Sequence, residues 1–331
     1  MSVRLPTTVR PRHYRLTIHP QLSVFKFTGT VDITIDVSAP TSRVELHAKQ
    51  LNVGSARVRS LDTSPGANWV AASSIQLEEK QEKLVLLFAD ALTAGSYELS
   101  IAFDGEINKH LAGFYWTSYK YNGEVKVFAT TQFEATDARR AFPCWDEPSF
   151  KATFTVVLRV PRDMAAISNT QAVSVTSIPH TNLREYEFAP TPVMSTYLLA
   201  YIIGEFDSIA TLTSGGVEVR VYTPLGKAPL ARFALDVAKR ALEYYEKLFR
   251  IPYPLSKMDL VAVPDFAAGA MENWGLITYR ELALLIDEEK STLDRKQRVA
   301  RTVCHEIAHQ WFGNLVRRAA YLYGTADLIG R

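Results

Sequence analysis

The stretch that decides the fold of the C-terminal part is STLDRKQRVARTVCHEIAHQWFGNLV, which runs from Ser291 to Val316. It opens with a capping-type S-x-x-D pattern and continues without proline or glycine as far as Gly313. Apolar residues recur at every fourth position, as in an amphipathic helix. They are Val299, Val303, Ile307 and Trp311. The pattern predicts one long helix with an apolar stripe.

Two histidines of this helix, His305 and His309, are four residues apart. Helical geometry places them about 40° apart around the axis and about 6 Å apart along it. Both imidazoles can therefore ligate one zinc ion, as in H-E-x-x-H helices generally. Glu306 lies beside them and can take a proton from a water molecule that the metal acidifies. This is the chemistry of peptide-bond hydrolysis.

The alternative is that these are structural histidines in an ordinary surface helix. His305, Glu306 and His309 fall, with Phe312, on a face that we expect to be buried next to the apolar stripe. A buried face with this content needs a charge partner, and a metal is the simplest one. The helix context therefore favours the zinc site.

Length and composition indicate the number of domains and the kinds of partner to expect. The 331 residues exceed the usual size of one domain, so two domains are expected. The net charge is +2, from 37 basic and 35 acidic residues, which gives no reason to expect a nucleic-acid partner. No stretch resembles a signal peptide or a membrane span, and the two cysteines, Cys144 and Cys304, are far apart in sequence. We expect a cytoplasmic protein without disulfides or a membrane partner; nothing in the sequence sets its oligomeric state.

The chain has two halves with different periodicities. As far as Phe206 it alternates or runs apolar over strand lengths, which predicts a β-sandwich or saddle with antiparallel strands over residues 1–206. The main predicted strands cover residues 13–20, 29–38, 82–89, 96–107, 152–161 and 195–206. After a strand at 217–224, residues 227–249 take a helical period. The expected fold class is α+β, with the helices in residues 207–331.

Two further segments contain acidic residues in unusual surroundings. In GAMENWG, Gly269 to Gly275, two glycines bracket Glu272 and would let the backbone approach a ligand closely. An ordinary bulged edge strand would give the same pattern. The second segment, TQFEATDARRAFPCWDEP from Thr131 to Pro148, reads by itself as a polar, proline-bounded connection with local salt bridges.

Together, the three segments resemble the zinc aminopeptidases of the gluzincin group, and within it the cytosolic puromycin-sensitive type. The likeness runs from about Arg4 to Val316, with the motifs in the family's order. It implies an N-terminal β-rich aminopeptidase domain over residues 1–206. Residues 207–331 would form an incomplete thermolysin-like catalytic domain that ends after the H-E-x-x-H helix.

The resemblance also implies roles for residues. His305 and His309 would bind one Zn²⁺ per chain, and Glu306 would be the general base. Glu272 would bind the free α-amino group of a peptide substrate, and Glu134 would share that task, because two carboxylates favour a cationic amine at a fixed distance from the scissile carbonyl. The remaining substrate-binding residues would be Gln132, which lines the pocket for the first side chain, and Gly269, Ala270, Met271 and Asn273, which hold the peptide.

The resemblance ends at Arg317. The family continues with an acidic stretch whose final Glu, nineteen residues after the second histidine, is the third zinc ligand; here that position is Leu328. Asp327 is adjacent, but a shift by one residue rotates a helical side chain by about 100°. Two histidines alone hold zinc weakly. We therefore expect a C-terminally truncated chain with an unrelated tail, weakly active or inactive.

Two hypotheses follow from these residues. The first is a zinc aminopeptidase, a hydrolase of peptide catabolism. The second is a non-catalytic truncated fragment, which serves as an interaction module or has no function. An endopeptidase of the thermolysin type would share the zinc helix but would leave Glu272 and Glu134 unexplained.

Overall fold

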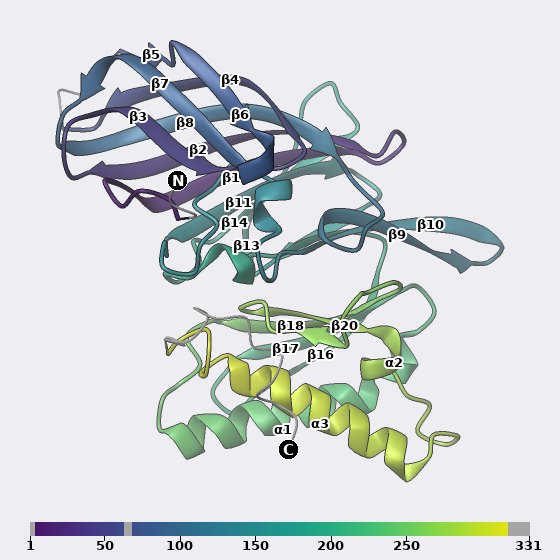
Figure 1. Ribbon diagram of the computed structural model, residues 1–331. Coiled ribbons are helices and arrows are strands. Elements are labelled where there is room, and N and C mark those ends of the chain that lie inside the picture. Colours follow the sequence, from purple (N-terminus) through teal and green to yellow (C-terminus); the bar gives the residue numbers. More distant parts are fainter. Residues whose placement is uncertain (1–3, 63–67, 317–331) are drawn as a thin grey trace.

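The computed structural model describes residues 4–62 and 68–316. Its N-terminal part consists of β-sheets, and its C-terminal part consists of a smaller sheet with two long helices on one face (Figure 1). This arrangement confirms the α+β class. No helix in the described ranges is both long enough and apolar enough to span a membrane.

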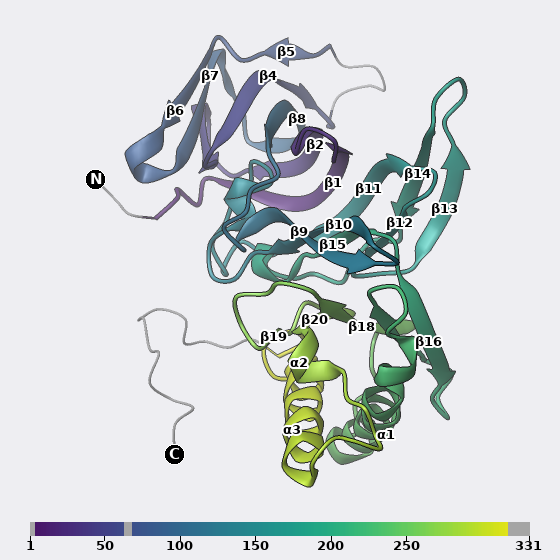
Figure 2. The same cartoon turned by 90° about the vertical axis from the view of Figure 1, so that its right-hand side faces the viewer.

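The largest sheet has eight strands, and buried and exposed residues alternate along its central strands. In spatial order the strands are β13 (Ala172–Ser177), β14 (Leu183–Phe188), β11 (Thr153–Pro161), β1 (Val9–Gln21), β2 (Lys26–Val37), β8 (Gly95–Glu106), β4 (Leu51–Ser60) and β5 (Val70–Ala71). A three-stranded sheet shares its apolar core and completes the expected sandwich (Figure 2). Its strands are β3 (Thr41–His47), β7 (Lys83–Leu92) and β6 (Ser74–Glu78), with the 3₁₀ turn η1 (Glu79–Gln81) between β6 and β7.

One strand pair departs from the expected antiparallel arrangement. β1 and β11 are parallel, with His13 opposite Thr153, whereas the other strand pairs described in the N-terminal part are antiparallel. A tight hairpin forces antiparallel pairing, but a long connection does not. Because much of the N-terminal part separates β1 from β11, local sequence patterns could not predict their relative direction.

A four-stranded sheet lies between the sandwich and the C-terminal part (Figure 2). In spatial order its strands are β12 (Ala165–Ser168), β15 (Tyr201–Gly204), β10 (Glu124–Gln132) and β9 (Gly113–Tyr121). The strand predicted over residues 195–206 is wrong in part, because the 3₁₀ turn η3 (Thr196–Leu198) precedes β15. Residues 195–204 are all buried, and a continuous apolar run does not distinguish a strand from a helical turn.

The C-terminal part contains a mixed sheet of five strands. They are β16 (Asp207–Leu212), β17 (Glu218–Thr223), β18 (Lys257–Val263), β20 (Leu276–Arg280) and β19 (Ala270–Met271), in that order. Helices α1 (Arg232–Phe249) and α3 (Leu293–His309) pack side by side against one face (Figure 1). The turn η4 (Ala228–Ala231) precedes α1, and the short helix α2 (Glu281–Leu284) follows β20. The first five residues of the helix predicted over 227–249 are thus not α-helical.

The change of sheet between β15 and β16 falls at Glu205 and Phe206. It supports a domain boundary after residue 206. This boundary remains a proposal.

Helix α3 is shorter than predicted at both ends. Its N-cap is Thr292, whose Oγ1 accepts a hydrogen bond from the Arg295 N–H, so the cap is not the expected Ser291. The helix ends at His309, because the following residues form turns in which Asn314 N–H donates to the His309 carbonyl. The expected apolar stripe is buried as predicted, from Val299 to Trp311.

Candidate metal and substrate amine site

The two histidines of α3 face one another. Their Nε2 atoms are 3.1 Å apart. The Nδ1 atom of His309 lies 3.0 Å from the carbonyl oxygen of Phe312. Because a carbonyl only accepts, this contact places the proton on Nδ1 and leaves a lone pair on Nε2, which is the arrangement that a metal ligand requires.

The geometry of this pair fits zinc. Two nitrogens that bind one tetrahedral zinc ion at its usual bond lengths are about 3.3 Å apart, and the observed separation is 3.1 Å. Within residues 4–62 and 68–316, no group of three metal-ligating side chains comes together. Leu328 and Asp327, the expected third position and its neighbour, lie outside those residues.

The face that was expected to be buried is buried only in part. Glu306 is 6% exposed, whereas His305 is exposed and His309 is partly exposed. At 100° per residue, Glu306 lies next to the apolar stripe and His305 lies about 180° from its centre. The prediction was wrong for His305 because it placed all three side chains beside the stripe.

Glu306 lies in an acidic, desolvated environment. Its Oε2 atom is buried and has no hydrogen-bond partner among the described residues. The pKa of Glu306 is raised to about 8, mainly by burial and also by the negative charges of Glu272 and Glu134. Three carboxylates from three separate segments therefore lie close enough to interact electrostatically.

The loop that carries Glu272 is hydrogen-bonded to the end of α3. Gln310, fully buried, donates from Nε2 to the Glu272 carbonyl at 3.2 Å and accepts from the Gly275 N–H at 3.2 Å. Asn314 Nδ2 donates to the same Glu272 carbonyl at 2.9 Å. These contacts fix the position of Glu272 relative to the histidine helix.

Sequence reasoning did not single out Gln310 and Asn314. The signal was present, because two amide side chains occur in the otherwise apolar run after His309. A buried amide needs hydrogen-bond partners, and a loop backbone commonly supplies them. The partner, however, could not be read from the sequence.

The two glycines that bracket Glu272 differ in the space that surrounds them. A Cβ on Gly269 would meet nothing within 4 Å. Gly275 has φ +76°, and a Cβ there would lie 2.3 Å from the Asn169 carbonyl oxygen. The expectation that both glycines admit a ligand is not met at Gly275, where the close neighbour is protein backbone. The other interpretation of this segment, an ordinary bulged edge strand, also has support, because β19 is an edge strand that contains Ala270 and Met271.

The other half of the site lies in the N-terminal part. Gln132 is the last residue of β10, is 8% exposed, and its Oε1 is buried without a hydrogen-bond partner among the described residues. Glu134 lies two residues further along the chain, before the 3₁₀ turn η2 (Ala138–Arg140). Arg139 pairs with the buried Asp146 at 2.9 Å. The local salt bridges that the sequence suggested are therefore present as well.

The structure brings together the three predicted carboxylates, which come from three separate segments. Glu306 interacts with Glu272 and Glu134, and Asn273 is buried beside Glu272, where its Nδ2 contacts Thr278 Oγ1 at 3.2 Å. Met271 is buried as well.

Comparison with known proteins covers both parts of the chain. Residues 10–198 match the Peptidase M1 N-terminal domain, and residues 233–321 match the Peptidase family M1 domain. The second match extends beyond Arg317, where the resemblance was expected to end.

Several curated proteins are similar over 95% of this chain. Aminopeptidase M1 of Arabidopsis thaliana is 48% identical and is covered over 35% of its own length. Endoplasmic reticulum aminopeptidase 1 of Homo sapiens is 45% identical and Puromycin-sensitive aminopeptidase of Caenorhabditis elegans is 42% identical, each covered over 33%. The chain thus spans about a third of the length of these relatives.

Proposed function

The chain belongs to the peptidase M1 family, and from this premise we propose that it acts as a zinc-dependent aminopeptidase that releases N-terminal residues from peptides. The observation that carries the proposal is the attachment of the Glu272 loop to the end of α3, beside Glu306. This attachment keeps an amine-binding carboxylate at a fixed distance from the histidine pair.

His305 and His309 would hold the zinc ion through their Nε2 atoms. When bound, the ion supplies a Lewis acid for the scissile carbonyl and acidifies water. The Phe312 carbonyl holds the His309 ring in the tautomer that presents Nε2.

Glu306 would act as the general base. Its buried Oε2 has free lone pairs for the O–H of a water molecule. A raised pKa suits a group that accepts a proton from water and then delivers it to the leaving amine, because both transfers need a pKa close to the working pH.

Glu272 and Glu134 would bind the α-ammonium group of the substrate. A cation placed between them relieves the repulsion among the carboxylates, which a substrate without a free amine does not do. Gln132 would line the pocket for the first side chain, and Gly269, Ala270, Met271 and Asn273 would hold the peptide backbone.

The test is hydrolysis of leucine p-nitroanilide by the zinc-loaded full chain. We expect turnover that falls about a hundredfold or more in Glu306→Gln, as for other general bases. N-acetyl-leucine p-nitroanilide should be a much poorer substrate, because it lacks the cation. Equal rates for the chain and Glu306→Gln would favour the non-catalytic alternative. Equal rates for the two substrates would favour an endopeptidase.

The proposal includes a cytoplasmic location. It is supported by the two free cysteines, Cys144 and Cys304, which suit a reducing compartment. Immunolocalisation of the tagged full chain tests it, and a signal in the endoplasmic reticulum would contradict it.

A further inference from the structure

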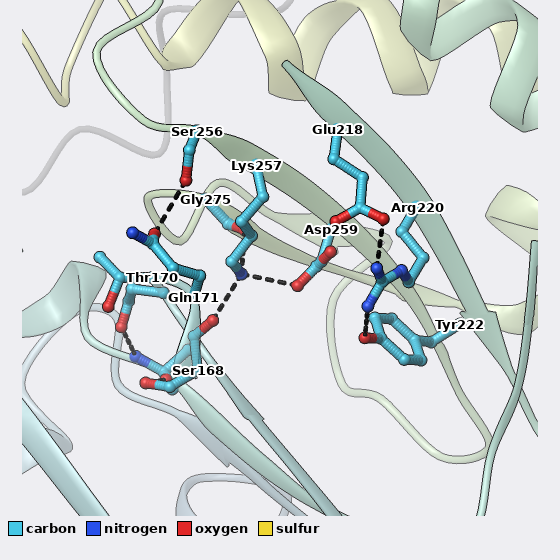
Figure 3. Close-up of polar contacts among 12 residues, drawn as sticks. Ser168, Thr170, Gln171, Glu218, Arg220, Tyr222, Ser256, Lys257, Asp259 and Gly275 are labelled. Carbon is cyan, nitrogen blue, oxygen red and sulfur yellow. Dashed lines mark hydrogen bonds and ion pairs between the residues drawn. The ribbon is translucent and has the colours of Figure 1, made fainter. Parts of the chain in front are cut away.

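The N-terminal part meets the Glu272 loop at a polar cluster centred on Lys257, the first residue of β18 (Figure 3). Lys257 is 6% exposed. Its Nζ donates to the Ser168 carbonyl at 2.6 Å and to the Gly275 carbonyl at 2.8 Å, and it pairs with Asp259 Oδ2 at 2.6 Å. These three acceptors use all three donors of the ammonium group.

Asn169 makes a second link across the same interface. Its Nδ2 donates to the Trp274 carbonyl and to the Leu198 carbonyl, both at 2.8 Å. Its Oδ1 accepts from the Ala200 N–H at 2.9 Å. Two successive loop carbonyls, at Trp274 and Gly275, are therefore held by Asn169 and Lys257.

The sheet behind Ser168 leads directly to the other half of the amine site. β12 ends at Ser168 and pairs with β15, and β15 pairs with β10, which ends at Gln132. A further hydrogen bond of 3.1 Å joins the Tyr201 N–H to Thr131 Oγ1. Three adjacent strands thus connect the Lys257 contact to Gln132, and Glu134 lies two residues beyond.

We propose, on the basis of the function proposed above, that Lys257 and Asn169 are positioning residues, which set Glu272 against Gln132 and Glu134 and so determine how the substrate amine is recognised. The amine-binding carboxylates come from two parts of the chain that share no sheet. Their separation depends on this interface. Within residues 4–62 and 68–316, the side chains of Lys257 and Asn169 supply the hydrogen bonds that tie the loop backbone across it. We refer to the pair as the latch.

The latch can be removed without leaving a buried charge unpaired. Lys257→Met alone would leave the buried Asp259 carboxylate without its ion-pair partner. The first variant is therefore Lys257→Met with Asp259→Leu. Arg220, next to this cluster, keeps Glu218 and the Tyr222 hydroxyl as partners in that variant. The second variant is Asn169→Ala, which removes the donor to the Trp274 carbonyl.

Ser256→Ala is the matched control. Ser256 Oγ donates to Gln171 Oε1 at 2.9 Å across the same interface, and among the described residues its side chain has no hydrogen bond to the loop (Figure 3). All variants are made in the full chain and compared by circular dichroism to establish that they fold.

The first readout is hydrogen exchange of residues 269–276, followed by mass spectrometry. We expect exchange at least tenfold faster in both latch variants, no change in Ser256→Ala, and no change in the distant strands β2 and β8. Because this readout needs neither metal nor substrate, it tests the latch independently of the proposed function. Unchanged exchange in folded latch variants would overturn the inference.

The second readout is binding in a Glu306→Gln background, which prevents turnover. Calorimetry compares L-leucinamide with N-acetyl-L-leucinamide. We expect the preference for the free amine to fall about tenfold in the latch variants and to persist in Ser256→Ala. A preference that persists in the latch variants would also overturn the inference. If the unaltered chain shows no preference for the free amine, that result contradicts the proposed function. Hydrogen exchange is then the readout that tests whether Lys257 and Asn169 hold the loop.

Discussion

Gln310 is an uncharged residue that connects two functional segments through one amide group. Replacement by leucine, of similar size, would leave the Gly275 N–H unpaired in a buried position. We expect a loss of about 1–3 kcal/mol in the free energy of unfolding. We also expect a higher KM for leucine p-nitroanilide with a smaller change in kcat. The substitution removes both amide contacts to the Glu272 loop, whereas Glu306, although its carbonyl also loses a contact at 3.3 Å, stays within α3.

Urea denaturation and steady-state kinetics measure the two effects of Gln310→Leu. Gln21→Leu, at an exposed position, is the control and should stay within about 0.5 kcal/mol of the unaltered chain. An unchanged KM would argue against a role for Gln310 in placing Glu272.

His47 makes the stability of the N-terminal part depend on pH. It is 4% exposed, and its Nδ1 accepts a hydrogen bond from the Asp146 N–H at 3.3 Å. Burial and, after it, the positive charges of Arg139 and Lys83 lower the pKa of His47 to about 3. The imidazole is therefore neutral in the folded state at neutral pH.

Because the folded-state pKa is below the unfolded value of 6.5, the unfolded state takes up a proton first as the pH falls. The contribution of His47 is complete above pH 6.5 and is lost between pH 6.5 and about 3. From pH 7.5 to pH 5, the unaltered chain should lose about 2 kcal/mol more stability than His47→Asn. Urea unfolding at both pH values measures this. His110→Asn, at an exposed site, should behave like the unaltered chain; identical losses in His47→Asn would contradict the assignment.

At the scale of elements, the start of α3 depends on one hydroxyl. Thr292 caps the helix by accepting from the Arg295 N–H at 3.4 Å, while Ser291 lies outside it. Thr292→Ala should cost about 1 kcal/mol of stability, as measured for other N-caps. Ser291→Ala, the adjacent hydroxyl, is the matched control and should have little effect. Thermal unfolding distinguishes the two, and a larger loss for Ser291→Ala would place the cap where the S-x-x-D pattern had predicted it.

At the scale of the whole molecule, zinc binding should stabilise the folded chain. A ligand that binds the native state raises the unfolding temperature by mass action, with about 2.7 kcal/mol gained at a concentration of one hundred times Kd. Zinc should therefore raise the Tm of the full chain, and a chelator should reverse the rise. The His305→Ala, His309→Ala variant should not respond, and Ser291→Ala should respond fully. An equal rise in the double variant would mean that zinc binds elsewhere.

The sequence by itself determined the features that depend on neighbours along the chain. The alternation in β1 and β2 and the apolar stripe of α3 are short-range patterns, and so is the spacing that brings His305 and His309 within 3.1 Å. Each follows from the fixed periods of strands and helices. Known motifs also indicated Glu134 and Glu272, but only through family resemblance.

The tertiary structure alone decided how these pieces meet. The parallel pairing of β1 with β11, the Gln310 contact with the Glu272 loop and the latch join segments that are far apart in sequence. Such contacts depend on which surfaces fit together once the sheets and helices pack, and they satisfy buried polar groups whose partners leave no local signal. The exposure of His305 was decided in the same way, since the helix period gives its direction but packing determines which direction is buried.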